Sequence, residues 1–208
     1  VVCVIDATHV AVLKLVENEH IYVNRKGFHS KNVQIICDAN LVILSVNANY
    51  GGSTHDSFVW RNSLVHTHME QNYLEGDRSS WLLGDSGYTQ QPWLMTPFRN
   101  TVANMPQRHY DNRLSLPRNT VKRCIGLLKM RFRCLAKERV LRYNPTKAGP
   151  IVNASCVLHN MCISANIEMD QQPQHDPELP AEEIGVFPPR VSQDGITHRN
   201  HILNMYFQ

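Results

Sequence analysis

The first residues of the chain form an apolar run in which both sides of an extended strand are apolar. Val2 and Val4 would lie on one side of it, while Cys3 and Ile5 would lie on the other. A strand with two apolar sides is covered on both faces, so it belongs in the middle of a sheet that has helices on either side. Asp6 closes this run, and its carboxylate needs a cation, hydrogen bonds or water to offset the cost of desolvation. The run therefore predicts a layered fold and makes Asp6 the first candidate for a functional residue.

The remaining pattern predicts strands first, then a helix, a strand, a loop and further helices. The other expected strands are residues 21–23, 33–37, 41–47 and 81–84, of which 33–37 and 41–47 form an antiparallel hairpin. The expected helices run from residue 53 or 54 to about 71, from 121 to about 135, from 150 to about 167 and from 198 to 207. Four prolines make residues 89–117 an expected loop. The fold class is therefore α/β or α+β, with one mixed sheet flanked by helices.

Apolar spacing also predicts which side of each helix is buried. The expected inner residues are Phe58, Val59, Leu64 and Val65 in the first helix, and Val152, Val157, Leu158, Met161 and Cys162 in the third. In the second helix they are Val121, Cys124, Ile125, Leu128 and Phe132, and in the last helix they are Ile202, Leu203, Tyr206 and Phe207.

Size and composition exclude several classes of protein. The chain has 208 residues, of which 42% are hydrophobic and 19% charged, as expected for a folded domain with a sizeable core. The longest apolar run is far too short to cross a bilayer, and no signal peptide opens the chain. Six cysteines without a CxxC pair argue against a disulfide scaffold or a zinc ribbon. The chain begins in mid-strand without Met, so we expect it to be part of a longer protein.

Charge is distributed unevenly along the chain. Residues 99–147 contain 13 basic and two acidic residues, whereas residues 148–189 contain six acidic residues and no Lys or Arg. The basic excess exceeds what solubility requires and suggests a polyanionic partner, most simply nucleic acid. We expect one domain over residues 1–167, an acidic, proline-rich linker over 168–189, and a helical segment over 190–208 that packs on the domain.

Asp85 has the same setting as Asp6, because it follows the apolar strand 81–84 and precedes a turn. Either aspartate alone would more often be a turn or cap residue than a metal ligand. If the two strands are neighbours, both carboxylates meet at one edge of the sheet, which suits a hard cation such as Mg²⁺. Such ions can activate water and stabilise the leaving oxygen in phosphodiester cleavage.

Five short motifs carry a family resemblance. They are VIDATHV at 4–10, GSTHDS at 52–57, LGDSGY at 83–88, NTVKRCIGLLK at 119–129 and LHNM at 158–161. In these motifs the chain resembles the nuclease domain of the PIF/Harbinger transposases, in particular the vertebrate transposase-derived branch, up to about residue 165 and again at 199–201. The resemblance implies an RNase H-like fold, a DDE triad that binds Mg²⁺ or Mn²⁺, and action on DNA in the nucleus, with the cytoplasm as a second location. It also implies a helix-turn-helix region upstream of these residues.

Carried over residue by residue, the first acid of the triad is Asp6 and the second is Asp85. The third position holds Lys122, where the family has glutamate. An ammonium group cannot ligate a metal, and at close range it would compete with one by pairing with the aspartates. We therefore expect the cleavage rate to be lower by orders of magnitude even if the fold survives. Ala7 replaces a family glycine and is expected to matter little.

Asp56 is the best candidate for a replacement metal ligand, since it lies just after the sheet within a family motif. An acid at a helix start that is favoured by the helix dipole is the stronger interpretation of Asp56. The spacings of His9, His55 and His159 match no compact zinc signature, so we expect hydrogen-bonded structural roles for them.

Two groups of basic residues are candidates for contacts with DNA phosphates. Lys129 and Arg133 are four positions apart on the side of the expected helix that holds Lys122. Arg25 and Lys26 lie on a turn and form a second candidate patch.

The sequence leaves two functions open. The first is a transposase-derived, metal-dependent DNA nuclease that is impaired at Lys122. The second is a catalytically inactive, domesticated or decaying transposase domain that binds nucleic acid or a protein. DNA is the expected partner in the first case, a separate DNA-binding protein is a second candidate partner, and no membrane is expected.

Overall fold

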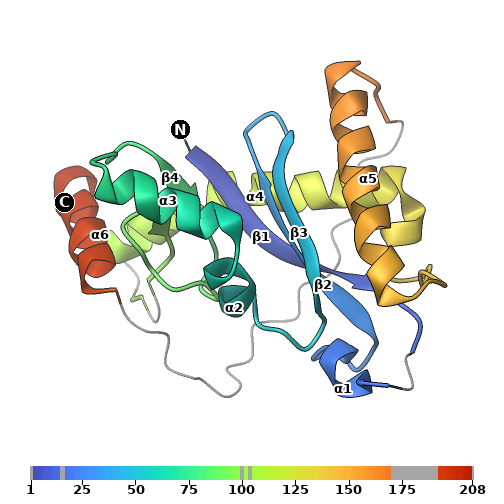
Figure 1. The fold of residues 1–208 in the computed structure, drawn as a ribbon. Helices are drawn as coiled ribbons and strands as arrows, with labels where there is room; N and C mark the ends of the chain where they lie inside the picture. Colours follow the sequence, from blue (N-terminus) through green and yellow to red (C-terminus); the bar gives the residue numbers. More distant parts are fainter. Residues whose placement is uncertain (1, 15–16, 99–100, 103–104, 170–191, 208) are drawn as a thin grey trace.

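The computed structural model describes residues 2–14, 17–98, 101–102, 105–169 and 192–207. Its centre is a five-stranded sheet with the strand order β3-β2-β1-β4-β5 (Figure 1). The strands are β1 Val2–Ala11, β2 Ser30–Cys37, β3 Ile43–Gly51, β4 Trp81–Leu83 and β5 Leu94–Met95. β1, β2 and β3 pair antiparallel, whereas β4 pairs parallel with both β1 and β5. The mixed sheet and its helices confirm the predicted fold class, which is consistent with an RNase H-like fold.

β1 is longer than predicted, and Asp6 does not end it. Residues 7–11 continue the antiparallel pairing with β2, from Ala7 opposite Gln34 to Ala11 opposite Ser30. On its other side, β1 pairs with β4 only as far as Val4. Asp6 therefore lies in the middle of the central strand, two residues beyond the point where its neighbour β4 stops.

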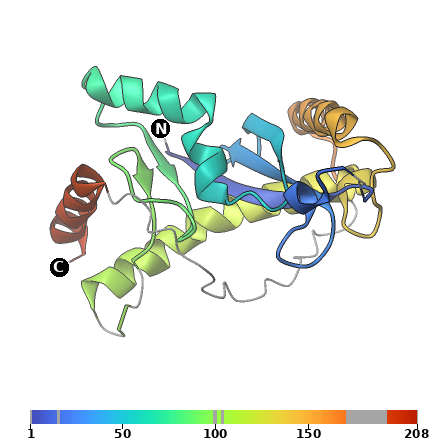
Figure 2. The same ribbon diagram turned by 60° about the horizontal axis from the view of Figure 1, so that its bottom comes forward.

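Helices cover both faces of the sheet (Figures 1 and 2). α4 Pro106–Arg131 and α5 Pro145–Ser164 share a core cluster with Val4 and Val10 of β1, and we call this side the α4 face. α2 Asp56–Arg61 and α3 Leu64–Leu74 pack on a second cluster that contains Cys3 and Ile5, and we call this side the α3 face. The alternation of the two sets along β1 explains why both of its sides are apolar.

α4 corrects the prediction of a loop over residues 89–117. The helix begins with Pro106 in its first turn and continues through Pro117 to Arg131. Proline suits a first turn because its missing N–H has no partner there in any case. Tyr110 and Leu114 are buried in the core cluster of the α4 face, and this packing offsets the helix bond that Pro117 cannot make.

The predicted strand 21–23 and the predicted helix 53–71 are also wrong. Residues 19–22 form the short helix α1 Glu19–Tyr22. The second segment is two helices, α2 and α3, because the Ser63 side chain accepts a hydrogen bond from the His66 amide and caps a new helix. Of its expected inner residues, Val59 is buried and Val65 packs on the core, while Phe58 and Leu64 are exposed.

α5 begins five residues earlier than predicted, because the Asn144 side chain caps it and Pro145 occupies its first turn. Pro150 therefore lies inside the helix. The helix is buried on one side only: Val152 is in the core, whereas Val157, Leu158 and Met161 are exposed. The 3₁₀ turn η1 Arg133–Leu135 follows α4.

The last helix, α6 Gln193–Tyr206, begins before the predicted residue 198. It packs near β5 and α4, where Leu203 is buried and the Arg199 guanidinium donates to the carbonyls of Thr96 and Pro97. Tyr206 is exposed, contrary to expectation. The predicted acidic linker lies almost wholly outside the described residues. No helix in the described ranges is long and apolar enough to span a membrane.

Candidate functional site

Asp6 and Asp85 occupy matching positions on neighbouring parallel strands. Val4 of β1 pairs with Leu83 of β4, and both side chains belong to the core cluster of the α4 face. Asp6 lies two residues further along β1, on the same face as Val4, and Asp85 lies two residues after Leu83, just beyond the end of β4. The topology therefore brings both carboxylates to the same level of the sheet, at the place where β4 ends beside β1.

The two carboxylates influence each other electrostatically. Burial raises the pKa of Asp6 to about 7, and the charge of Asp85 is the second cause of this shift. The Ala7 amide, which donates to Asp6 Oδ1 at 2.7 Å, and the Arg118 guanidinium both lower the pKa of Asp6 but do not cancel the shift. Asp85 Oδ1 accepts a hydrogen bond from the Gly87 amide at 2.9 Å. A buried carboxylate whose pKa is raised and whose neighbour is a second acid is a candidate for function.

Asp56 approaches the same site from the α3 face. It is the first residue of α2, and its Oδ1 accepts a hydrogen bond from the Asn32 amide group at 2.7 Å. Burial raises the pKa of Asp56, as does the charge of Asp85, and Asp56 in turn raises the pKa of Asp6. Asp56 is thus both the expected acid at a helix start and a third negative charge near the pair.

The oxygen ligands at this site suit a hard cation that completes its shell with water, and not a metal ion held by protein side chains alone. Within the described ranges, no three His, Cys, Asp or Glu side chains converge closely enough to hold a metal ion together. Mg²⁺ is commonly held by one or two carboxylates, while waters and substrate phosphates complete its shell. Asp6 and Asp85 can supply those carboxylate oxygens, and a dication would relieve the repulsion that raises the pKa of Asp6.

Lys122 lies on α4, next to the buried Val121 and one turn after Arg118. Residues four apart share one side of a helix, so Lys122 lies on the same side of α4 as Arg118, whose charge lowers the pKa of Asp6. α4 packs directly against β1. The residue that the family resemblance places third in the triad is therefore a lysine on the helix that packs against β1, the strand of Asp6.

Tyr88 is a site residue to which the sequence analysis assigned no role. Its side chain is buried, and its hydroxyl has no hydrogen-bond partner of normal geometry in the described part of the chain. Burial raises the pKa of Tyr88 well above 10, and Asp56, Asp6 and Asp85 all add to the shift. The Gln34 side chain acts on the hydroxyl as a hydrogen-bond partner and counteracts the shift, although its amide nitrogen lies outside normal hydrogen-bond geometry. Tyr88 thus remains a protonated donor beside three carboxylates, and its place in the motif at 83–88 was the available signal.

Three of the four predicted phosphate-binding residues gather around His9. Burial lowers the pKa of His9 to about 4, and the charges of Lys129, Lys26 and Arg25 contribute in that order. Lys129 Nζ donates to the His9 carbonyl at 3.2 Å, so part of its hydrogen-bonding capacity is used inside the fold. Arg133 is exposed in η1, after the end of α4.

The histidines have hydrogen-bonded positions in the structure. His9 Nδ1 lies 3.0 Å from Ser30 Oγ, and His55 Nδ1 lies 2.9 Å from an Arg25 guanidinium nitrogen. His159 is fully buried, and its Nε2 lies 2.9 Å from the Leu41 carbonyl. These contacts agree with the structural roles expected for them.

Comparison with known proteins identifies relatives of this arrangement. Residues 5–160 match the family described as DDE superfamily endonuclease. "Putative nuclease HARBI1" of Homo sapiens is 34% identical over 183 residues, which cover 86% of this chain and 51% of that protein. The Bos taurus protein of the same name is 33% identical over 186 residues (88% and 52%), and "Protein ALP1-like" of Arabidopsis thaliana is 27% identical over 188 residues (83% and 46%).

The chain spans about half the length of the curated relatives it matches. No solved structure matches it. The family match includes Asp6, Asp85 and Lys122, and it covers most of the sheet and the helices that position them. The chain therefore belongs to the DDE superfamily endonucleases, on the Harbinger transposase-derived branch that the nuclease relatives represent.

Proposed function

We propose that this domain binds DNA and holds a Mg²⁺ or Mn²⁺ ion with Asp6 and Asp85, and that phosphodiester cleavage is impaired at Lys122. One observation carries the proposal. Two carboxylates lie at the same level of neighbouring parallel strands, and their repulsion and burial raise the pKa of Asp6 to about 7. Such a buried pair of like charges is costly to a fold, and a bound cation would lower that cost.

The side chains around the pair have separate roles. The bound ion would supply activation of water and stabilisation of the leaving oxygen. Arg25 and Lys26 hold the phosphate backbone without reading its sequence. Tyr88 keeps its proton, so its hydroxyl is available to donate a hydrogen bond to a ligand bound at the site. Lys122 opposes metal binding, because its ammonium group attracts the two carboxylates and so competes with a metal ion for them.

The second candidate is a domain that binds nucleic acid or a protein without catalysis. The lysine at the third triad position favours it, because glutamate-to-lysine exchange removes a ligand and reverses a charge. Both candidates place the protein with DNA in the nucleus, and both allow a separate DNA-binding protein as partner. They differ in whether Asp6 and Asp85 still bind a metal.

Calorimetric titration with Mg²⁺ and Mn²⁺, combined with a DNA-cleavage assay, separates the two. The proteins to compare are the parent chain, Asp85→Asn and Lys122→Glu. We expect weak metal binding by the parent, none by Asp85→Asn, and both tighter binding and cleavage by Lys122→Glu. Absence of metal binding in all three proteins would overturn the proposal in favour of the second candidate. Cleavage by the parent that is lost in Asp6→Asn would support the metal site but refute the role given to Lys122.

A further inference from the structure

A cavity of about 320 Å³ lies beyond the far end of β1, outside the acidic site. Its walls are the end of β1 with the residues that follow it, the turn before β2, and the segment after η1, and its lining residues are Ala11, Val12, Leu13, Lys14, Phe28, His29, Lys137 and Val140. Two walls are joined directly, since the Leu13 amide donates to the Leu141 carbonyl at 3.2 Å. The cavity is large enough for one small ligand group.

The lining combines an aromatic ring with cationic groups. Lys137 Nζ lies 5.2 Å from the centroid of the Phe28 ring, and Lys14 lines the same cavity. Among the lining residues themselves there is no Asp or Glu. A flat ring next to ammonium groups is complementary to a ligand that has a planar aromatic part and an anionic part.

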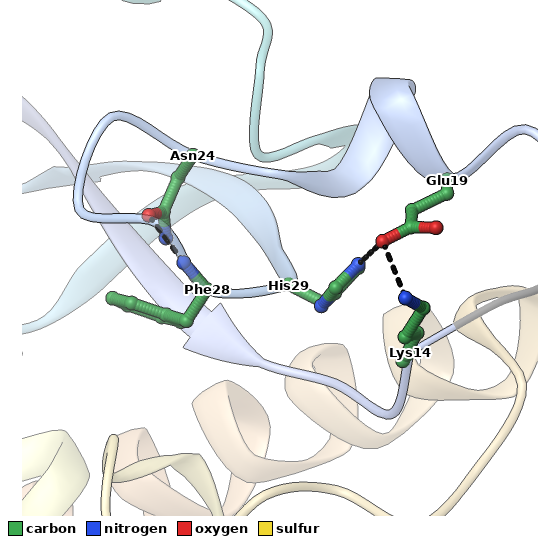
Figure 3. Close-up of polar contacts among 5 residues, drawn as sticks. All are labelled: Lys14, Glu19, Asn24, Phe28 and His29. Carbon is green, nitrogen blue, oxygen red and sulfur yellow. Dashed lines mark hydrogen bonds and ion pairs between the residues drawn. The ribbon is translucent and has the colours of Figure 1, made fainter.

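Hydrogen bonds hold the turn that presents Phe28. Asn24 is buried, and its Oδ1 accepts from the amides of Lys26 at 2.9 Å and of Phe28 at 3.4 Å. Its amide group donates to Ser30 Oγ at 2.8 Å, which ties the turn to β2. Phe28 is therefore positioned by a buried side chain, not by a loose loop (Figure 3).

Glu19 holds the cationic side of the cavity in place. Its Oε1 lies 3.0 Å from both Lys14 Nζ and His29 Nε2 (Figure 3). The side chains of Lys14 and Glu19 are 67% and 39% exposed, so an arriving anion can exchange with the carboxylate at Lys14. The pair thus keeps Lys14 at the cavity while the site is empty.

The cavity lies in line with the acidic site along β1. Five residues separate Asp6 from Ala11, which is about 17 Å in an extended strand. His9 lies between them with the basic residues Arg25, Lys26 and Lys129 around it. His9 also packs edge-on against Phe28, with ring centroids 6.3 Å apart.

We propose that this cavity is a nucleotide subsite, in which an unpaired base stacks on Phe28 and the adjacent phosphate is bound by Lys14 and Lys137. The inference rests on the proposed function in one respect, namely that DNA is the substrate. It adds that the strand is unpaired where it enters this cavity, because a base within a duplex cannot reach a ring in a cavity. The basic line around His9 makes DNA a better-matched occupant than an apolar peptide, although Leu13 and Val140 offer some apolar contact.

Fluorescence anisotropy with a short single-stranded oligonucleotide, the same strand with abasic positions, and the matching blunt duplex tests this subsite. The variants are Phe28→Leu, which retains an apolar side chain, and the double variant Lys14→Gln with Lys137→Gln. Lys147→Gln, at an exposed position of α5, is the matched charge control. Thermal melting shows whether each variant is folded.

We expect Phe28→Leu to weaken binding of the single strand by about 5- to 150-fold, the range for loss of one base stack. It should leave binding of the abasic strand and the duplex nearly unchanged. The lysine pair should weaken binding of the intact and abasic strands alike, more than Lys147→Gln does. Glu19→Gln should tighten binding, because Lys14 is then released to the phosphate.

Failure of the inference and failure of the proposed function give different results. If the parent binds these oligonucleotides but Phe28→Leu still binds the intact strand more tightly than the abasic strand, the subsite is refuted and DNA binding stands. If the parent binds no DNA at all, both are overturned. If the cavity variants lose binding of a peptide but not of DNA, the occupant is a protein segment and the subsite is likewise refuted.

Discussion

The surroundings of the two halves of β1 differ in the sign of their charges and in how far those charges are exposed to solvent. Around Asp6 the charges are negative, largely buried and mutually repulsive, and they raise the pKa of that carboxylate. Around His9 the charges are positive and include the exposed Arg25 and Lys26, and burial together with these charges lowers the pKa of His9. The difference indicates two kinds of ligand on one strand, a cation at the first half and a phosphate chain at the second.

The largest expected effect is the gain in stability when the buried negative charge of Asp6 is removed. The folded-state pKa of Asp6 is raised above its usual value of 3.8, so its favourable contribution is complete below pH 3.8 and is lost as the pH rises through about 7. At pH 8 without metal, Asp6→Asn should therefore be more stable than the parent by on the order of 2 to 4 kcal/mol. Chemical denaturation at pH 8 and at pH 4 measures the difference, which should nearly vanish at pH 4.

Two controls sharpen this result. Adding Mg²⁺ should stabilise the parent and leave Asp6→Asn unchanged. Hydrogen bonds from Ser80 and Ser79 lower the pKa of the exposed Asp77 to about 2, so Asp77→Asn should bring no gain in stability at pH 8. An Asp6→Asn protein that is less stable than the parent at pH 8 would contradict the picture of an uncompensated acid pair.

The second effect concerns His9, and here stability changes with pH in the opposite direction. Its folded-state pKa is lowered from 6.5 to about 4, so the unfolded chain takes up a proton first and stability falls as the pH falls from 6.5 towards 4. The loss should be about 2 to 3 kcal/mol. It is best measured in Asp6→Asn, where the opposing contribution of Asp6 is absent, and His9→Gln in that background should remove the slope. A flat profile in Asp6→Asn alone would refute the assignment.

Tyr88 should show a smaller effect that separates stability from function. Tyr88→Phe removes a buried hydroxyl whose contact with the Gln34 side chain falls short of normal hydrogen-bond geometry, so the free energy of unfolding should rise by about 1 kcal/mol or stay unchanged. In a Lys122→Glu background, the same change should lower cleavage or metal affinity about tenfold. Denaturation and calorimetry on the paired variants check both. A loss of stability with unchanged activity would show that Tyr88 is only a packing residue.

The smallest effects are expected from single exposed cations. Arg25→Gln and Lys26→Gln should each weaken DNA binding only slightly and should reduce the dependence of log K on log salt concentration by roughly one unit. Anisotropy titrations at several salt concentrations measure this slope. Arg142→Gln, an exposed arginine outside this group, is the control and should leave the slope nearly as it was. Equal changes in all three variants would mean that no defined phosphate track passes His9.

The predictions that succeeded were those that depend on local pattern. The hairpin over β2 and β3 and the strand before Asp85 are short apolar runs bounded by turn residues, and such runs are recognised without knowledge of the fold. The helix face that holds Val121, Cys124 and Leu128 was visible in the same way. The motifs that predict Asp6, Asp85 and the altered position Lys122 as site residues are local patterns too, and that assignment stays a prediction.

The predictions that failed were those in which tertiary packing overrides local preference. Pro117 predicted a loop, yet burial of Tyr110 and Leu114 carries α4 across it. Val157 and Met161 predicted a buried helix side, but α5 packs on the sheet by its other side. In both cases the deciding contacts are with residues distant in the sequence, which no local pattern records.

By itself, the sequence determined that this protein has a central strand with two apolar sides, a second strand that is followed by an aspartate, and a lysine where the family resemblance places the third acid. Only the tertiary structure decided that Asp6 and Asp85 lie at one level, that the Tyr88 hydroxyl lies buried near them, and that Phe28 and Lys137 meet at a cavity. The physical reason is that electrostatic coupling and cavity shape depend on distances between segments far apart in the chain, and pairing of strands and packing of helices set those distances.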